Sequence, residues 1–127
     1  AVHALHLREA LEQGLAQIPQ ATVFAQKAQR LPNTVQFGIR GFDGETLLMQ
    51  LDRMGIAVSS GSACTSGKTE PSHVLKAMGV PEELALSSVR VSFGKDNTVA
   101  DAEKLLQALG EIIDTTSKSA VMMAANV

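Results

Sequence analysis

Residues 34–55 read TVQFGIRGFDGETLLMQLDRMG, and they predict a strand, a turn and a helix in that order. In the first six residues apolar side chains alternate with polar or small ones, as in a half-buried strand. Asp43 stands where a helix N-cap is expected, and Gly55 stands where a helix would end. Between them, apolar residues at helical spacing predict one apolar helical face, which contains Leu47, Leu48, Leu51 and Met54.

The segments on both sides of this stretch continue the mixture of helices and strands. Upstream, Pro19 ends a predicted amphipathic helix, and Ala21–Ala25 predicts a short strand. Downstream, residues 56–58 predict another short strand, and a helix is expected around Ser72–Met78. The upstream helix is predicted from the spacing of Leu7, Leu11, Leu15 and Ile18.

The C-terminal third predicts one more strand and a long helix. In SVRVSF, residues 88–93, Arg90 and Ser92 lie on the face opposite the apolar residues. Thr98 and Asp101 resemble a capping box at the start of the helix. The last residues, TTSKSAVMMAANV, have no clear period and are expected to fray. Together these elements predict an α+β fold in layers.

The composition of the chain limits the classes of function that we expect. The chain has 127 residues, enough for one domain with a core, and a net charge of −2. It has no Trp or Tyr and no basic patch, so no nucleic-acid partner is expected. No apolar run approaches the roughly 20 residues that span a bilayer, so no membrane partner is expected either. A single cysteine cannot form an internal disulfide, which favours the cytoplasm or a mitochondrial matrix.

The only cysteine, Cys64, lies in SSGSACTSGKT, residues 59–69. This segment is close to a phosphate-binding P-loop, but five residues rather than four separate Gly61 from Gly67. The small neighbours predict an accessible thiol in a mobile loop, whereas a lone cysteine can equally be a small core residue. The residues alone favour neither interpretation of Cys64.

Other polar residues have simple structural interpretations. Taken alone, Arg90 is most simply an exposed cation or half of a structural ion pair. His3 and His6 are three residues apart, but no carboxylate or cysteine shares their turn, so no metal site is predicted.

Three segments resemble the NifS/IscS-type cysteine desulfurases, which belong to the class V aminotransferases. These segments are residues 31–64, which end in GIAVSSGSAC, residues 59–79, SSGSACTSGKTEPSHVLKAMG, and residues 83–101, ELALSSVRVSFGKDNTVAD. The resemblance covers roughly residues 1–115, with residues 116–127 as a tail. It implies the small C-terminal domain of a fold-type I pyridoxal phosphate enzyme, with a short, mainly antiparallel sheet packed by helices.

The resemblance also implies an activity. Enzymes of this family use pyridoxal phosphate to remove sulfur from L-cysteine, which gives L-alanine and a cysteine persulfide for iron–sulfur cluster assembly. Cys64 matches the nucleophile that carries the persulfide, and Arg90 matches the residue that binds the substrate α-carboxylate. The implied partners are L-cysteine, an iron–sulfur scaffold or other sulfur acceptor, and a second subunit of the full-length homodimer. Cys64 is also a candidate transient ligand of an iron–sulfur cluster.

The family holds its cofactor on a lysine that follows a histidine. Here His3, His6 and His73 are followed by Ala, Leu and Val, so no cofactor-binding residue is identified. We therefore expect part of a longer enzyme, a fragment or a truncated gene product, that alone neither binds pyridoxal phosphate nor turns over. One alternative is a stand-alone, non-catalytic domain that accepts persulfide or acts as a dimerisation decoy. Another is a structural domain of the same family whose thiol is incidental.

Overall fold

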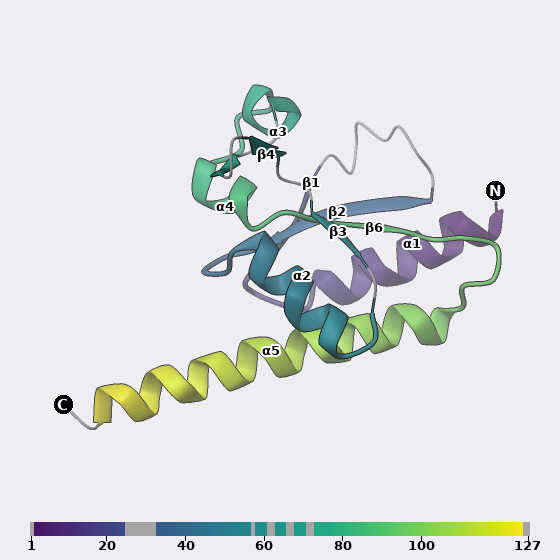
Figure 1. The fold of residues 1–127 in the computed structure, drawn as a ribbon. Helices are drawn as coiled ribbons and strands as arrows, with labels where there is room; N and C mark the ends of the chain where they lie inside the picture. The colour runs from purple at the N-terminus through teal and green to yellow at the C-terminus, as the bar shows by residue number, and fades with distance from the viewer. Residues whose placement is uncertain are drawn as a thin grey trace.

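A computed structural model of the chain describes residues 2–24, 33–56, 58–60, 63–65, 68–70 and 73–125. Figure 1 shows helices packed against a small sheet, with a separate short hairpin. The elements are α1 (Val2–Leu15), β1 (Ala21–Phe24), β2 (Thr34–Ile39), α2 (Gly44–Arg53), β3 (Ser59–Ser60), β4 (Ala63–Thr65), β5 (Lys68–Glu70), α3 (His73–Ala77), α4 (Glu82–Leu86), β6 (Val89–Ser92) and α5 (Val99–Ala125).

The main sheet has four strands in the order β1-β2-β6-β3, and every neighbouring pair is antiparallel. Strands β4 and β5 form a second, two-stranded sheet. Antiparallel strands combined with helices make this an α+β fold, which confirms the fold class predicted from the sequence.

Helices cover both faces of the main sheet, but unequally. In Figure 1, α1 and α5 lie below the sheet, and α3 and α4 lie above it. The lower face carries the main core, to which α1, α2, β2, β6 and α5 all contribute buried side chains. The upper face has a much smaller cluster beside α3 and α4. This cluster contains Phe24, Leu75 and Ala85, with Val80 and Leu84 at its edge. Among the described residues, no other apolar cluster packs on the upper face.

The local signals of the sequence are confirmed at the ends of the helices. The Asp43 carboxylate accepts a hydrogen bond from the Thr46 amide at 3.2 Å and so caps α2. Gly55 follows that helix with φ of +81°, in the left-handed region where glycine is favoured. At the start of α5, the Asp101 carboxylate accepts from the Thr98 amide at 2.9 Å, as a capping box requires.

The segment between α2 and β6 differs from the structure predicted from the sequence. Residues 56–58 were expected to form a strand, but Ile56 and Val58 lie outside any strand and pairing begins at Ser59. The reason is that the Ile56 amide donates to the Leu51 carbonyl at 2.9 Å and so completes the end of α2. Helix α4 was not predicted, because five residues with only Ala85 buried give no helical period.

The last helix is longer than the sequence predicted. Residues 116–125 were expected to fray, but they continue α5, whose last turns extend beyond the other elements in Figure 1. No Gly or Pro occurs between Glu111 and Ala125, so nothing in the sequence ends the helix. The boundary between residues 1–115 and the tail stays a prediction, because α5 runs through it, and residues 126–127 lie outside the described part. The described residues include no helix with both the length and the apolar composition needed to cross a bilayer.

Candidate functional site

The upper face of the sheet places Arg90 at its centre. Along β6, Val89 and Val91 are buried, whereas Arg90 and Ser92 are exposed, as the alternation in the sequence predicted. Strand β6 lies between β2 and β3, and Arg90 is in register with Gln36 on one side and with Ser59 on the other. Because two ladders fix its backbone, Arg90 extends from a rigid part of the fold.

The side chains described around Arg90 are polar and uncharged. Thr34 Oγ1 and Ser92 Oγ are 3.3 Å apart, and Gln36 Nε2 donates to Ser88 Oγ at 2.9 Å. Within the described part of the chain Arg90 forms no ion pair, whereas Arg8 and Glu12 on α1 do. The ion-paired interpretation of Arg90 therefore has no support within the described part of the chain, and Arg90 is an exposed cation available to an anionic ligand.

The segment that contains Cys64 begins beside this face. Strand β3 pairs with β6, and Cys64 follows Ser60 by four residues, which span at most about 14 Å between Cα atoms. The sequence predicted a loop here, but the backbone of Cys64 lies in β4 and pairs with Thr69 of β5. β-branched Thr65 and Thr69 favour these strands.

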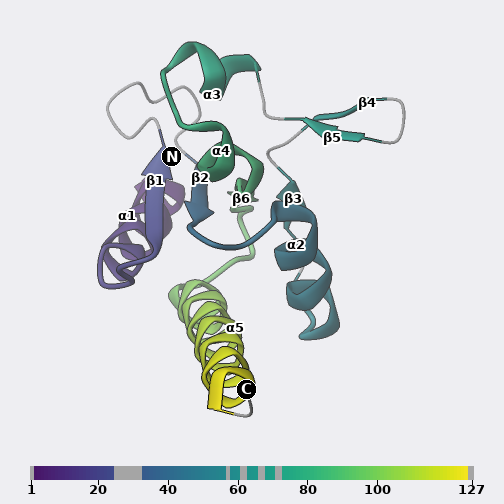
Figure 2. The ribbon, with the colours of Figure 1, turned by 90° about the vertical axis from the view of Figure 1, so that its left-hand side faces the viewer.

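In Figure 2 the hairpin of β4 and β5 projects from the side of the domain where β3 lies. The fold therefore brings the backbone of the cysteine segment close to the strand edge beside Arg90. The side chain of Cys64 lies outside what the structure describes, so an accessible thiol in a mobile segment stays a prediction.

The described residues do not fit a site for pyridoxal phosphate. A lysine that forms a Schiff base with a cofactor must lie in a protected pocket, where its pKa is lowered. Lys76, Lys95 and Lys104, whose side chains are described, are all exposed. In the described ranges, no group of three or more His, Cys, Asp or Glu could hold a metal ion. His3 Nε2 instead lies 2.7 Å from the Asn97 carbonyl oxygen, a contact that ties α1 to the start of α5.

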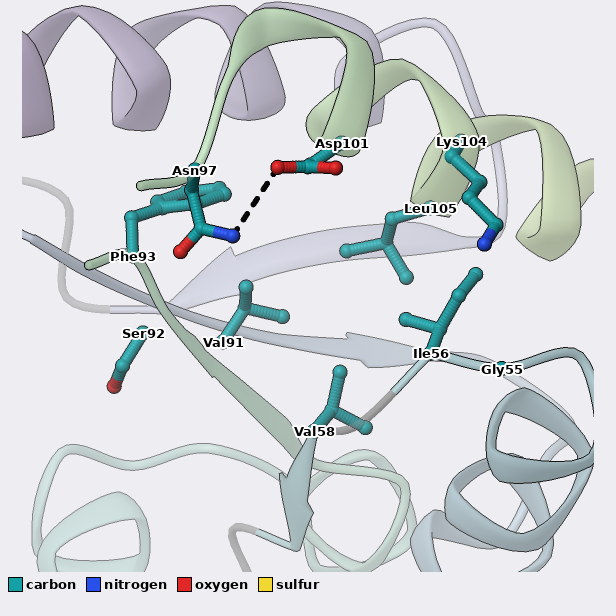
Figure 3. A pocket seen from close by; sticks show the side chains of 10 residues that line it. All are labelled: Gly55, Ile56, Val58, Val91, Ser92, Phe93, Asn97, Asp101, Lys104 and Leu105. Carbon is teal, nitrogen blue, oxygen red and sulfur yellow. Dashed lines mark hydrogen bonds between the residues drawn. The ribbon is translucent and has the colours of Figure 1, made fainter. Parts of the chain in front are cut away.

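A pocket of about 260 Å³ lies on the other side of β6 (Figure 3). Its acidic side chain, Asp101, accepts from the Thr98 amide and from Asn97 Nδ2. First the Thr98 amide and then the Asn97 side chain lower the pKa of Asp101. These contacts are those of a helix cap, so Asp101 is a structural residue. The pocket is lined by Gly55, Ile56, Val58, Val91, Ser92, Phe93, Asn97, Asp101, Lys104 and Leu105.

The sequence named Cys64 and Arg90 as candidate site residues, but it did not indicate that Gln36 and Ser88 lie beside Arg90. The alternation in TVQFGI did place Gln36 on the polar face of its strand. No local pattern, however, predicts which residue of another strand it faces.

Comparison with known proteins gives a consistent result. The profile of the family described as aminotransferase class-V matches residues 1–105. A curated cysteine desulfurase from Gluconacetobacter diazotrophicus is 47% identical over 108 residues, which are 84% of this chain and 27% of that protein. A cysteine desulfurase IscS from Methanosarcina thermophila is 43% identical over 109 residues, which are 86% of this chain and 27% of that protein. The chain thus spans about a quarter of the length of the curated relatives it matches.

Solved structures agree with the sequence matches. A NifS-like protein from Rickettsia africae superposes with a TM-score of 0.75 at 38% identity, over 89% of this chain and 29% of that one. The cysteine desulfurase CsdA from Escherichia coli, at 21% identity and a TM-score of 0.63, supports the fold over 90% of this chain and 25% of its own. Membership of this family implies pyridoxal phosphate in the full-length enzyme. The chain belongs to the aminotransferase class-V family, and its relatives there include the cysteine desulfurases.

Proposed function

We propose that the chain is the small domain of a cysteine desulfurase, which takes sulfur from L-cysteine and leaves L-alanine and a persulfide on Cys64. The observation that carries this proposal is the position of Arg90. It is an exposed cation, without an acidic partner among the described residues, on the central strand next to the strand that leads into the Cys64 hairpin. The relatives named cysteine desulfurase support the same reaction.

Arg90 would bind the α-carboxylate of the substrate. A guanidinium is planar and presents paired N–H groups, so it can bind both oxygens of one carboxylate. Arg90 is held by two strand ladders, so it would fix the position of the substrate as well as contribute to its affinity. Its uncharged neighbours Thr34, Gln36 and Ser92 would not compete for the guanidinium.

Cys64 would accept the sulfur. Its thiolate attacks the substrate sulfur and forms an S–S bond, while the carbon–sulfur bond breaks and its electron pair stays on the carbon, which takes up a proton. The product of this step on the protein is a persulfide. A second protein with an acceptor thiol then takes the outer sulfur of this persulfide. The pyridoxal phosphate that the family requires would be held by residues other than the described ones, because the described lysines do not fit it.

Further parts of this proposal rest on the resemblance of the sequence to the NifS/IscS-type cysteine desulfurases. The sulfur acceptor would be an iron–sulfur scaffold or another thiol-containing acceptor protein, and Cys64 would be a transient ligand of the assembling cluster. The full-length enzyme would be a homodimer in the cytoplasm or a mitochondrial matrix.

The test uses kinetics of the full-length enzyme that contains this chain. Cys64→Ser should abolish sulfide release, because a hydroxyl is a poor nucleophile towards sulfur. Arg90→Ala removes a charge-assisted contact of about 1.5–3 kcal/mol, which corresponds to a loss of at least tenfold in kcat/KM. Cys64→Ser with near-normal turnover would refute the role of the thiol. Arg90→Ala with unchanged kcat/KM would refute the carboxylate site.

The misfit of the lysines supports a second candidate, a stand-alone domain that accepts persulfide or pairs with full-length subunits. This candidate predicts that the 127-residue chain takes sulfur onto Cys64 from a separate desulfurase. The chain would be incubated with a full-length relative and L-cysteine, and its mass would be measured with and without reducing agent. A Cys64→Ala variant provides the control, and the absence of added sulfur on the wild-type chain would count against this candidate.

A further inference from the structure

Gln36 is the residue directly opposite Arg90 on the neighbouring strand. In the antiparallel pair of β2 and β6, Gln36 and Arg90 are register partners. Side chains directly opposite each other in such a pair lie on the same face, with Cβ atoms about 4.5–5.5 Å apart. The Gln36 amide is therefore within reach of the Arg90 guanidinium.

A hydrogen bond fixes the side-chain amide of Gln36 against the sheet. Its Nε2 donates to Ser88 Oγ at 2.9 Å, and Ser88 is fully buried. The anchor is itself fixed, because the Ser88 amide donates to the Ala85 carbonyl at 3.1 Å. Gln36 is half-buried while Arg90 is exposed, so the space above Arg90 stays open to a ligand.

The other polar atom of the Gln36 side-chain amide, Oε1, is a hydrogen-bond acceptor. With Nε2 bonded to Ser88, Oε1 of Gln36 has no donor among the residues that the structure describes. A guanidinium has five N–H donors, and a bidentate carboxylate uses only two of them. One of the remaining donors of Arg90 can be satisfied by Oε1 of Gln36 without loss of the carboxylate contact.

Gln36 is uncharged, and this affects how the guanidinium of Arg90 can bind a ligand. Opposite charges that face each other across an antiparallel pair attract each other. A glutamate at position 36 would have nearly the shape of Gln36, but it would pair with Arg90 and compete with the substrate. The neutral amide leaves the charge of Arg90 available.

We propose that Gln36 is a positioning residue of the carboxylate site. Tethered to Ser88, it orients the Arg90 guanidinium through its amide oxygen and keeps the surroundings of that guanidinium uncharged. This inference rests on the proposed function, because it requires that Arg90 bind the substrate carboxylate.

The test compares two variants of nearly equal side-chain length in the full-length enzyme. Gln36→Glu should raise KM for L-cysteine at least tenfold and leave kcat within threefold. Gln36→Met, which is uncharged but has no acceptor oxygen, should raise KM two- to fivefold. L-cysteine methyl ester, which lacks the carboxylate charge, serves as a competitive inhibitor, and its inhibition constant should stay within twofold of the wild-type value in both variants.

The Arg90→Ala variant distinguishes a failure of the proposed function from a failure of the inference about Gln36. If Arg90→Ala leaves kcat/KM unchanged, the carboxylate site of the proposed function fails, and the role of Gln36 fails with it. If Arg90→Ala raises KM but Gln36→Glu leaves it within twofold, the inference about Gln36 is overturned and the proposed function stands. Equal weakening of L-cysteine and its methyl ester in Gln36→Glu would show general damage to the fold, and this result also overturns the inference.

Discussion

Gly44 packs so closely that it provides a sharp test of the fold around the site. It is the first residue of α2 and is buried against the segment that joins α4 to β6. A Cβ at this position would lie 2.7 Å from the Ser88 carbonyl oxygen and 2.9 Å from that of Leu86. Both atoms belong to the backbone, so they cannot move aside as the end of a flexible side chain could. Gly44→Ala should therefore push α2 away from the start of β6.

The expected magnitude follows from two opposing effects. Overpacking of this kind typically costs about 1–3 kcal/mol. Replacing glycine by alanine recovers about 0.5–1 kcal/mol of backbone entropy. The net loss should be about 0.5–2 kcal/mol, and an unfolding entropy of about 0.27 kcal/mol/K for 127 residues converts this to a fall of roughly 2–7 °C in Tm.

Gly110 provides the matched control. It lies within α5, and a Cβ there would meet nothing within 4 Å. Gly110→Ala should therefore raise Tm by about 2–4 °C through the same gain of 0.5–1 kcal/mol. Thermal unfolding followed by circular dichroism measures both variants. If Gly44→Ala unfolds at or above the wild-type temperature, the close contact with the Ser88 backbone is wrong.

Three further predictions concern other parts of the molecule. Gly38→Ala should lower Tm by several degrees, because a Cβ would lie 2.6 Å from Ser87 Oγ and 2.9 Å from the Leu84 carbonyl oxygen; a Tm equal to that of the wild type would argue against this packing. Contacts with the ionised form lower the pKa of Asp101 below its ordinary value of 3.8, so its carboxylate stabilises the fold above that pH and loses this effect as the pH falls through the lowered pKa. Asp101→Asn should therefore lower Tm at pH 7, and the difference from wild type should shrink below about pH 3.8; a constant difference would contradict the capping role. The 127-residue chain, mixed with pyridoxal phosphate and desalted, should show no stoichiometric visible absorbance that borohydride fixes on a lysine.

The parts of the fold that the sequence predicted correctly depend on neighbours along the chain. The cap at Asp43, the left-handed Gly55 and the alternation around Arg90 are each encoded within a few residues. The predictions that were wrong concern features that depend on residues outside the segment or on many residues together. Residues 56–58 look like a strand, but the end of α2 uses the Ile56 amide, and the helicity of residues 116–125 comes from the absence of a stop signal rather than from a period.

The candidate site also has features that are encoded within a few residues and features that depend on residues far apart in sequence. Arg90 and Cys64 were identified because their segments are distinctive, and the face of Arg90 followed from alternation. The pairing of Gln36 with Arg90 and the anchor at Ser88 depend on the register between two strands that lie about 50 residues apart in sequence. Strand register is set by packing of the whole sheet, so no short pattern contains it.

The central claim is that Cys64 carries sulfur taken from L-cysteine, and measuring the mass of the peptide that contains Cys64 tests it most directly. The full-length enzyme would be mixed with L-cysteine, quenched at acidic pH and digested, and the peptide that contains Cys64 would be weighed with and without reducing agent. The account predicts a gain of one sulfur atom on Cys64 that the reductant removes and that Cys64→Ser does not show. An enzyme that turns over L-cysteine while Cys64 never gains sulfur would contradict the account.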